Sequence, residues 1–465
     1  MQQSQNFETA FTALEALLGA RVSRKGADLA LHGQNETYFA PTPPDAVAWP
    51  ESTAEVSEIM KICHAHGVPV TPWGAGSSLE GHALALRGGV SLDMTRMDQI
   101  LSTSPEDRLA TVQPGILRER LNVELRATGL FFPVDPGANA SLGGMAATRA
   151  SGTTTVRYGS MRDNVAALEV VLADGTIIRT GTGAAKSAAG YDLTALMLGS
   201  EGTLGIITEL TLRLHAQPEA VTSAVCAFET LEAAVETVIL TIQMGIPMAR
   251  IEFVDAWVAK VFNASAGTTL PETPHLMIEF HGSEASVAED AERFGEVVAE
   301  MGGADFAWAR TTEERAALWR MRHGAYPACL AARPGSIGLV TDACVPISRL
   351  AEAVEAARKD IEAEGLIGPI LGHVGDGNFH AILVLERDNA QELAAAKRVA
   401  HKMAERALEM GGTITGEHGI GIGKRDMMPS EHGPAWAVMG AIKAALDPKG
   451  ILNPGKLVPQ SGDIQ

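Results

Sequence analysis

The spacing of hydrophobic residues predicts that the first half of the chain mixes helices with short strands. A helix is expected at 6–18. A second one begins after Ser52, which forms a capping-box pattern with Glu55, and ends at Gly67. Hydrophobic runs between turn residues predict strands at 46–49, 68–71, 165–172, 176–180 and 206–214.

The pattern changes after Pro218. The predicted order there is a strand, a helix, two strands and a helix, which indicates a ferredoxin-like unit. A second, helix-rich part begins at Thr311. The elements behind this interpretation are strands at 221–228, 251–254 and 276–280, a helix at 231–245, and amphipathic helices marked by Val287 to Met301 and by Leu350, Val354 and Ile361.

A glycine-rich stretch at 372–380 carries His373 and His380, seven residues apart. This spacing favours a strand-turn-strand over a helix, and a hairpin could bring both imidazoles to one point. Some forty residues on, Glu417 and His418 add a carboxylate and a third imidazole. Two histidines and a carboxylate could hold a divalent metal and leave one histidine as a base. The spacing equally allows loop histidines that share no site.

Two further glycine-rich loops lie at 72–81 and 135–152. Small residues let backbone amides approach a phosphate, or let a flat cofactor lie against the backbone. An ordinary turn would explain the first loop, and close packing of two backbones would explain one such loop more readily than two. Neither loop has the spacing of a dinucleotide-binding fingerprint.

Charge narrows the choice of partners. The 465 residues include 37 Lys and Arg against 56 Asp and Glu, a formal net charge of −19. A surface of this sign repels nucleic acid and anionic lipid. An anionic substrate would need a local arginine or a metal ion, and the length suggests two or three domains.

Cysteine usage and hydropathy indicate a reducing, aqueous compartment. Cys63, Cys226, Cys329 and Cys344 lie far apart and form no Cys-x-x-Cys pair, so neither a disulfide framework nor a cysteine metal site is indicated. The N-terminus has no signal-peptide pattern, and no apolar stretch is long enough to span a bilayer. We expect a cytoplasmic protein with at most peripheral contact at the inner face of the membrane.

Taken together, these motifs resemble a known family. The two loops, with Tyr158-Gly159, the turn at 173–175 and the segment 199–205, are similar to the FAD domain of the vanillyl-alcohol oxidase and p-cresol methylhydroxylase superfamily. Within it, residues 41–457 resemble the FAD-linked D-2-hydroxyacid dehydrogenases. The resemblance implies an α+β fold in which a two-part FAD-binding domain (1–218) is followed by a ferredoxin-like cap domain for the substrate (219–410) and a C-terminal segment (411–465) that returns to the flavin.

The resemblance also implies which residues meet FAD. Ser77 occupies the place where some members carry a histidine bound covalently to the flavin, so FAD is expected to be non-covalent. His82 stands where relatives commonly have glycine. The expected FAD contacts are Gly74, Ala75, Gly76, Ser77, Ser78, Gly81, Pro136, Gly137, Ser141, Gly143, Gly144, Thr148, Gly152, Val165, Glu201, Gly202 and Ile207.

By the same resemblance, His373, His380 and Glu417 hold zinc or manganese, His418 takes the hydroxyl proton, and Arg322 binds the substrate carboxylate. Oxidation of a 2-hydroxy acid needs such a base, a hydride acceptor and a carboxylate clamp. A guanidinium suits the clamp because it can donate two parallel hydrogen bonds. Arg322 could instead be a surface charge, as could its neighbour Arg320.

The substrate side chain is expected to be short or apolar. Members that oxidise D-2-hydroxyglutarate carry an asparagine where this chain has Ile382, and no lysine lies near 335–337. We therefore predict D-lactate or a similar acid. D-2-hydroxyglutarate, glycolate and, more remotely, flavin-dependent alkyl transfer are the alternatives. A quinone, a cytochrome or an electron-transfer flavoprotein would accept the electrons. The sequence allows either a monomer or a homodimer.

Overall fold

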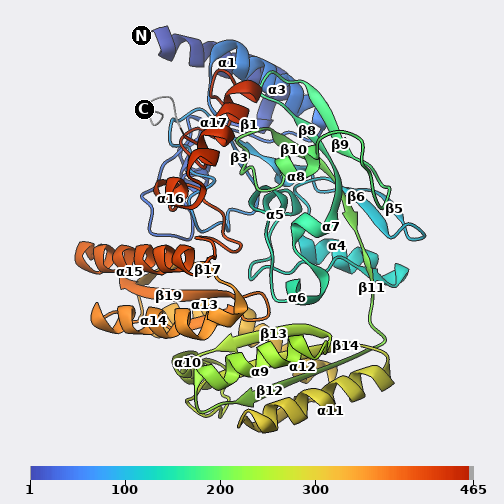
Figure 1. The fold of residues 1–465 in the computed structure, drawn as a ribbon. Coiled ribbons are helices and arrows are strands. Elements are labelled where there is room, and N and C mark those ends of the chain that lie inside the picture. The colour runs from blue at the N-terminus through green and yellow to red at the C-terminus, as the bar shows by residue number, and fades with distance from the viewer. Residues whose placement is uncertain (1, 460–465) are drawn as a thin grey trace. The chain divides into compact units, whose positions relative to one another are not determined.

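The computed structural model describes residues 2–459 and divides into two compact units (Figure 1). Unit 1 comprises Met1–Ala150, Ser160–Ala216 and Glu417–Gln465, and unit 2 comprises Ser151–Gly159 and Gln217–Gly416. The predicted start of the FAD-binding domain at residue 1 and the predicted end of the C-terminal segment at residue 465 lie outside the described residues.

The first sheet of unit 1 is covered by helices α1 (Gln2–Leu18) and α3 (Thr53–His66), which pack hydrophobic residues against it. Gly67 caps α3 with φ of +67°, as predicted. The capping box is only half formed: Ser52 accepts from the Glu55 amide, whereas the Glu55 carboxylate accepts from the Glu51 amide. The strand order is β1 (Val22–Ser23), β2 (Ala46–Ala48), β4 (Val90–Asp93) and β3 (Val70–Trp73).

The second sheet of unit 1 is antiparallel and packs against the apolar side of helix α5 (Leu142–Thr148). Its strands confirm those predicted near 165, 176 and 206. Their order is β5 (Ile100–Ser104), β6 (Leu109–Val112), β10 (Ile206–Arg213), β8 (Val165–Val171) and β9 (Ile177–Gly181). The remaining helices and strands of unit 1 are α2 (Gly26–His32), α4 (Arg118–Leu125), β7 (Leu130–Phe131), α7 (Met161–Asn164), α8 (Leu193–Met197), β11 (His215–Ala216), α16 (Met428–His432) and α17 (Pro434–Leu446).

Unit 2 is built on one eight-stranded sheet. Its first part follows the ferredoxin-like order, because the four strands β12, β13, β14 and β15 lie as β15-β12-β14-β13. Helix α10 (Ala256–Ala266), between the second and third strands, was not predicted. The elements are β12 (Ala220–Ala227), α9 (Leu231–Gln243), β13 (Met248–Val254), β14 (His275–Gly282), α11 (Glu284–Glu300) and β15 (Ala304–Ala309).

The second part of unit 2 has a similar order, in which strands β16 and β17 are followed by a helix, two strands and a helix, and it extends the same sheet, since β18 pairs with β13. The part predicted as helix-rich thus also supplies strands, of which β16 and β17 were not predicted. Helices α14 and α15 lie side by side (Figure 1). The elements are β16 (Ser336–Val340), β17 (Ala343–Cys344), α14 (Leu350–Ala363), β18 (Ile370–His373), β19 (Asn378–Glu386) and α15 (Ala390–Glu409), preceded by α12 (Thr312–His323) and α13 (Ala325–Ala331), with α6 (Thr155–Tyr158) from the earlier segment.

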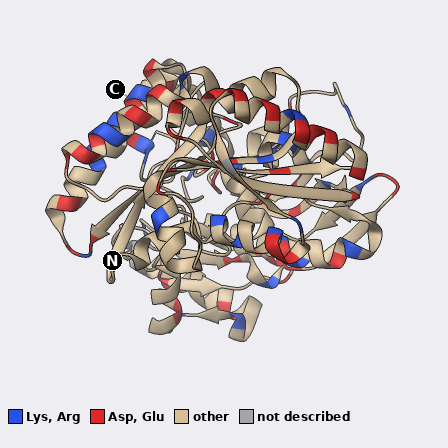
Figure 2. Ribbon diagram, turned by 90° about the horizontal axis from the view of Figure 1, so that it is seen from below, with Lys and Arg blue, Asp and Glu red and all other residues tan. Residues whose placement is uncertain are grey.

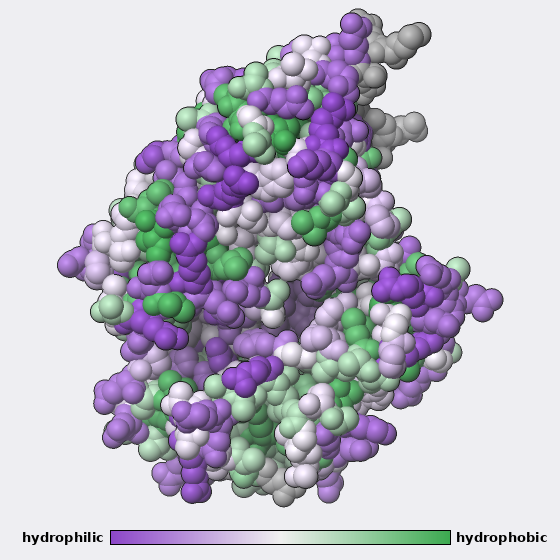
Figure 3. Space-filling model, turned by 180° about the vertical axis from the view of Figure 1, so that it is seen from behind, coloured by the Kyte–Doolittle hydropathy of each residue, from purple (hydrophilic) through white to green (hydrophobic). Residues whose placement is uncertain are grey.

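Charged and apolar residues are widely distributed. Figure 2 shows Asp and Glu (red) and Lys and Arg (blue) interspersed along many helices, so the excess of acidic residues is shared among them. On the face shown in Figure 3, hydrophilic side chains separate smaller hydrophobic groups. No helix among the described residues has the length and apolar character needed to cross a bilayer.

Candidate active site

The predicted hairpin at 372–380 is confirmed, and it places His373 and His380 on the same face. Strands β18 and β19 pair His373 with Asn378 and Leu371 with His380. The two ring centroids are 5.4 Å apart, and a ring nitrogen of each histidine lies within 4.8 Å of one of the other. Gly377 is required in the turn, because it has φ of +77° and an added Cβ would lie 2.0 Å from the Val345 carbonyl oxygen.

Both imidazoles are held through Nδ1. His373 Nδ1 lies 2.8 Å from a carboxylate oxygen of Glu252, and His380 Nδ1 lies 3.1 Å from the carbonyl oxygen of Thr341. Because these oxygens accept hydrogen bonds, each Nδ1 donates a proton to its partner. This is how proteins orient histidines that bind a metal, so the pair fits a divalent cation.

Glu252 is a functional residue that the sequence interpretation missed. It is fully buried on β13, and its second carboxylate oxygen accepts a hydrogen bond of 2.5 Å from Arg322 Nη2. Glu252 therefore joins Arg322 to His373 in one polar group. Its signal in the sequence is a lone acidic residue in the apolar strand Ile251 to Val254.

Arg322 itself is buried on α12, with a side chain only 7 % exposed, whereas Arg320 is exposed. Its Nε is a buried donor without a hydrogen-bond partner among the described residues. A buried guanidinium with unused donor capacity fits an anionic ligand, because an unsatisfied buried donor costs free energy. The alternative that Arg322 is a surface charge is wrong.

Glu417 and His418 directly follow Gly416, the last residue of unit 2. The chain just before them is tied to the hairpin: an added Cβ on Gly416 would lie 2.2 Å from Asn378 Nδ2, and Thr415 donates to Asp342. Asn378 begins the strand that carries His380 and also donates to Asp342. One peptide bond separates this anchored point from Glu417.

In unit 1, the glycine-rich segments expected to meet FAD come together. An added Cβ on Gly74 would lie 2.3 Å from Ser141 Oγ, so the first loop lies against the second. The segment at 199–205 joins them through a hydrogen bond of 2.9 Å from the Glu201 amide to the Ala147 carbonyl. An added Cβ on Gly202 would lie 2.3 Å from Pro72 Cγ. Glycine is needed at these points because backbones and side chains approach closely.

The first loop also offers hydrogen-bond donors. The backbone N–H groups of residues 75–78 are not used in any hydrogen bond to the described residues. This stretch is also not fully buried, so a ligand could reach it. Consecutive amides of this kind form a concave anion site that suits a pyrophosphate. The loop therefore fits the flavin nucleotide predicted for it.

The other predicted flavin contacts lie in varied surroundings. Val165 and Ile207 are buried at the starts of β8 and β10, and Gly152 belongs to the segment Ser151–Gly159 of unit 2. Thr148 Oγ1 donates to the Gly144 carbonyl at the end of α5. Around the second loop, Pro136 and Gly143 are half-buried, Gly137 and Gly144 are exposed, and Ser141 is buried.

Comparisons with known proteins agree with this geometry. Residues 217–457 match the C-terminal domain of FAD-linked oxidases, and residues 44–181 match an FAD-binding domain. The chain is 49% identical to a probable mitochondrial D-lactate dehydrogenase of Danio rerio, covering 92% of this chain and 87% of the relative. It is 44% identical to a mitochondrial D-lactate dehydrogenase [cytochrome] of Arabidopsis thaliana (92% and 76% covered) and 39% identical to the glycolate oxidase subunit GlcD of Bacillus subtilis (89% of both).

Solved structures share the fold. An alkyldihydroxyacetonephosphate synthase superposes with a TM-score of 0.77 at 21% identity, covering 96% of this chain and 86% of that one. A p-cresol methylhydroxylase with substrate bound gives the same TM-score at 18% identity, covering 97% and 96%. The predicted fold class, an α+β chain with the FAD-binding fold of this superfamily, is thereby confirmed.

Proposed function

Since the chain belongs to the family of FAD-linked oxidases, we propose that it oxidises a short D-2-hydroxy acid, D-lactate first among them, to the 2-oxo acid. The FAD-binding domain at 44–181, together with the FAD-linked oxidase domain at 217–457, makes it a flavoprotein oxidoreductase. The observation that carries the choice of substrate class is the buried group in unit 2. There, Glu252 joins the buried guanidinium of Arg322 to the imidazole of His373, whose ring lies 5.4 Å from that of His380.

In this proposal, each group has one task. Arg322 binds the substrate carboxylate, and His418 takes the proton from the hydroxyl. FAD, when bound, supplies the acceptor for the hydride that leaves C2. A divalent cation, zinc or manganese, would be held by His373, His380 and Glu417 and would lower the pKa of the hydroxyl. The hydroxy acid thus loses a proton and a hydride, which leaves the 2-oxo acid.

The flavin contacts and domain roles are part of the same proposal. We assign FAD binding to residues 1–218, substrate binding to 219–410 and the return to the flavin to 411–465. The unused amides of 75–78 and the close approach of Gly74 to Ser141 support the first assignment. Ser77, in place of a histidine, supports non-covalent FAD.

The side chain at Ile382 supports a short substrate. Ile382 lies two residues after His380 on the same face of β19 and is buried among apolar residues. It offers no hydrogen bond to a second carboxylate, which disfavours D-2-hydroxyglutarate. Glycolate is the second candidate, because the chain is 39% identical to a glycolate oxidase subunit. The likeness to an alkyl transferase concerns the fold alone.

The electron acceptor is also proposed from the relatives. Three of them are named D-lactate dehydrogenase [cytochrome], so we place a cytochrome before a quinone or an electron-transfer flavoprotein. The proposed location is the cytoplasm, with at most peripheral contact with a membrane.

Anaerobic reduction of the flavin tests the function directly. Purified protein mixed with D-lactate should lose the absorption band of oxidised flavin, and L-lactate should leave it unchanged. Glycolate and D-2-hydroxyglutarate, assayed in parallel, rank the alternatives by their rates. A flavin that stays oxidised with every hydroxy acid would contradict the proposal.

Arg322→Lys is expected to raise the KM for D-lactate about 10- to 100-fold, because lysine keeps the charge but cannot donate two parallel hydrogen bonds. The matched variant Arg320→Lys should change KM less than about twofold, since Arg320 is exposed. Steady-state kinetics with saturating dye acceptor measure both. Equal effects of the two substitutions would remove Arg322 as the clamp. Lysine is preferred to alanine because an unpaired, buried Glu252 would destabilise the fold.

A further inference from the structure

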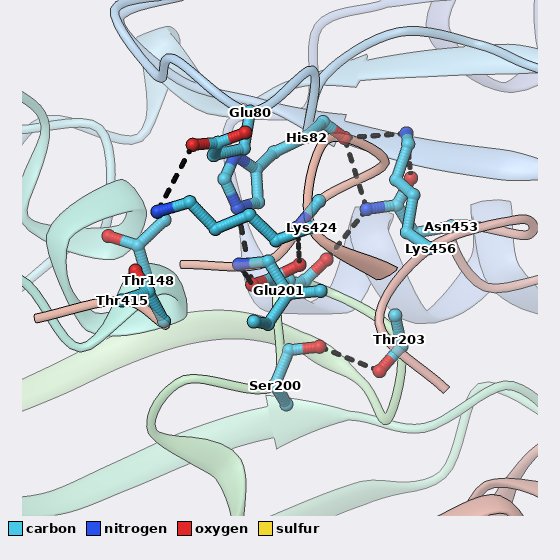
Figure 4. A network of polar contacts seen from close by, with 12 residues as sticks. Glu80, His82, Thr148, Ser200, Glu201, Thr203, Thr415, Lys424, Asn453 and Lys456 are labelled. Carbon is cyan, nitrogen blue, oxygen red and sulfur yellow. Dashed lines mark hydrogen bonds and ion pairs between the residues drawn. The ribbon is translucent and has the colours of Figure 1, made fainter. Parts of the chain in front are cut away.

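Glu201, which was predicted to contact FAD, uses its carboxylate elsewhere within unit 1. The side chain is buried, and its two oxygens accept hydrogen bonds from the amides of Ile420 (2.6 Å) and Gly421 (2.8 Å). His82 Nε2 lies 3.2 Å from the first oxygen (Figure 4). The two amides lie two and three residues after His418, so the carboxylate holds the segment that carries the proposed base.

The backbone at Glu201 adds a second observation. Glu201 has φ of +54°, a conformation that favours glycine, and it lies between Gly199 and Gly202, which also have positive φ. A glycine would adopt this conformation with less strain. The presence of glutamate therefore indicates that its side chain has a task that outweighs the strain.

The segment after His418 is shaped to pass over this carboxylate. An added Cβ on Gly419 would lie 2.7 Å from Glu201 Oε1 and 2.8 Å from His82 Nε2. Gly421 approaches the carbonyl oxygen of Glu80 still more closely, since an added Cβ would lie 2.0 Å from it. Two glycines at these places let the segment lie directly against the side chains of Glu201 and His82 and the backbone of Glu80.

Glu80 gives the segment a second attachment. Its carbonyl oxygen accepts from the Ile422 amide at 2.8 Å, and its carboxylate lies 3.3 Å from Lys424 Nζ (Figure 4). Glu80 belongs to the first glycine-rich loop, and Glu201 to the segment 199–205. Both carboxylates therefore connect the proposed flavin-binding loops to residues 420–424.

The other side of the network is fixed by a buried lysine. Lys456 is fully buried, and its Nζ donates to the carbonyls of His82 and Leu84 (each 2.6 Å) and to Asn453 Oδ1 (2.5 Å). Asn453 Nδ2 in turn donates to the carbonyl of Glu201 at 2.6 Å. These bonds fix the backbones of His82 and Glu201, as Figure 4 shows, and so the place of the carboxylate.

We infer that Glu201 is a positioning residue for catalysis: its carboxylate sets the place of His418 through the amides of Ile420 and Gly421. Burial by itself would raise the pKa of Glu201, but His82 and the two amides lower it, which agrees with a carboxylate that is ionised and engaged. The inference rests on the proposed function, in which His418 is the base.

Glu201→Gln tests the inference, because an amide of the same shape keeps one acceptor and turns a donor toward the second backbone amide. We expect kcat with D-lactate to fall about 100-fold, as a misplaced base would cause, with KM and FAD content within about twofold of the wild type. Hydrogen exchange over 417–424 should become about 10-fold faster. The matched variant Glu209→Gln, on the strand that follows the same loop, should change neither kcat nor the exchange rate over 417–424.

The outcomes separate the inference from the function on which it rests. Loss of FAD from Glu201→Gln with unchanged exchange over 417–424 would show that the carboxylate serves the flavin and would overturn the inference. In the wild type, the amides of Ile420 and Gly421 should be protected from exchange. Unprotected amides would overturn it even if the variant failed to fold. A wild-type protein inactive with every hydroxy acid would refute the function, while the exchange measurements would still decide the task of Glu201.

Discussion

Replacement of His418 by asparagine is expected to lower kcat with D-lactate about 10²- to 10⁴-fold, the usual contribution of a general base. Asparagine keeps a polar side chain of similar size but cannot take a proton. The segment that follows His418 is held by hydrogen bonds from the amides of Ile420 and Gly421 to Glu201. These bonds involve no atom of His418, so the backbone of the segment should stay in place in the variant. Rapid-mixing measurements of flavin reduction give the rate of the chemical step directly.

Two measurements make this result specific. FAD content by absorbance and metal content by mass spectrometry should match the wild type, because His418 is proposed neither to hold the flavin nor to ligate the cation. His401→Asn, at an exposed histidine on α15, serves as the control and should leave the rate unchanged. A reduction rate within about threefold of the wild type would remove His418 as the base.

The hairpin at the centre of the site could be predicted from sequence because its signals are local. Glycines set the turn, and the spacing of His373 and His380 brings both rings to one face of the paired strands. Helix α10, which was not predicted, also has local signals: the cap Asp255 and the terminal Gly267, with hydrophobic residues between them.

The partners of these residues could not be predicted, because they depend on distant pairing. Glu252 reaches His373 across 121 positions of sequence, and only the pairing of β13 with β18 brings them together. Likewise, a glutamate between two glycines at 201 resembles any other loop residue until its positive φ and its bonds to residues 420 and 421 are seen. Spacing identifies a motif, whereas long-range pairing decides what each side chain contacts.

Removal of one imidazole from the pair should abolish metal binding. His380→Gln is expected to lower affinity for zinc or manganese more than the 10- to 100-fold that loss of a supporting residue typically costs. After dialysis, the bound metal should fall from about one equivalent to less than about a tenth. FAD should remain, since the loops of unit 1 proposed to bind the flavin do not include His380.

Two variants calibrate this loss. Glu252→Gln should weaken metal binding by about 10- to 100-fold only, because His373, a proposed ligand, loses the carboxylate that orients it but keeps its own imidazole. His275→Gln is the matched control, because His275 is a buried histidine of the same sheet, on β14. This variant should bind as much metal as the wild type even if its fold is less stable. If His380→Gln binds as much metal as the control, or if chelation leaves wild-type activity intact, the two histidines are structural and the proton must be removed without help from a cation.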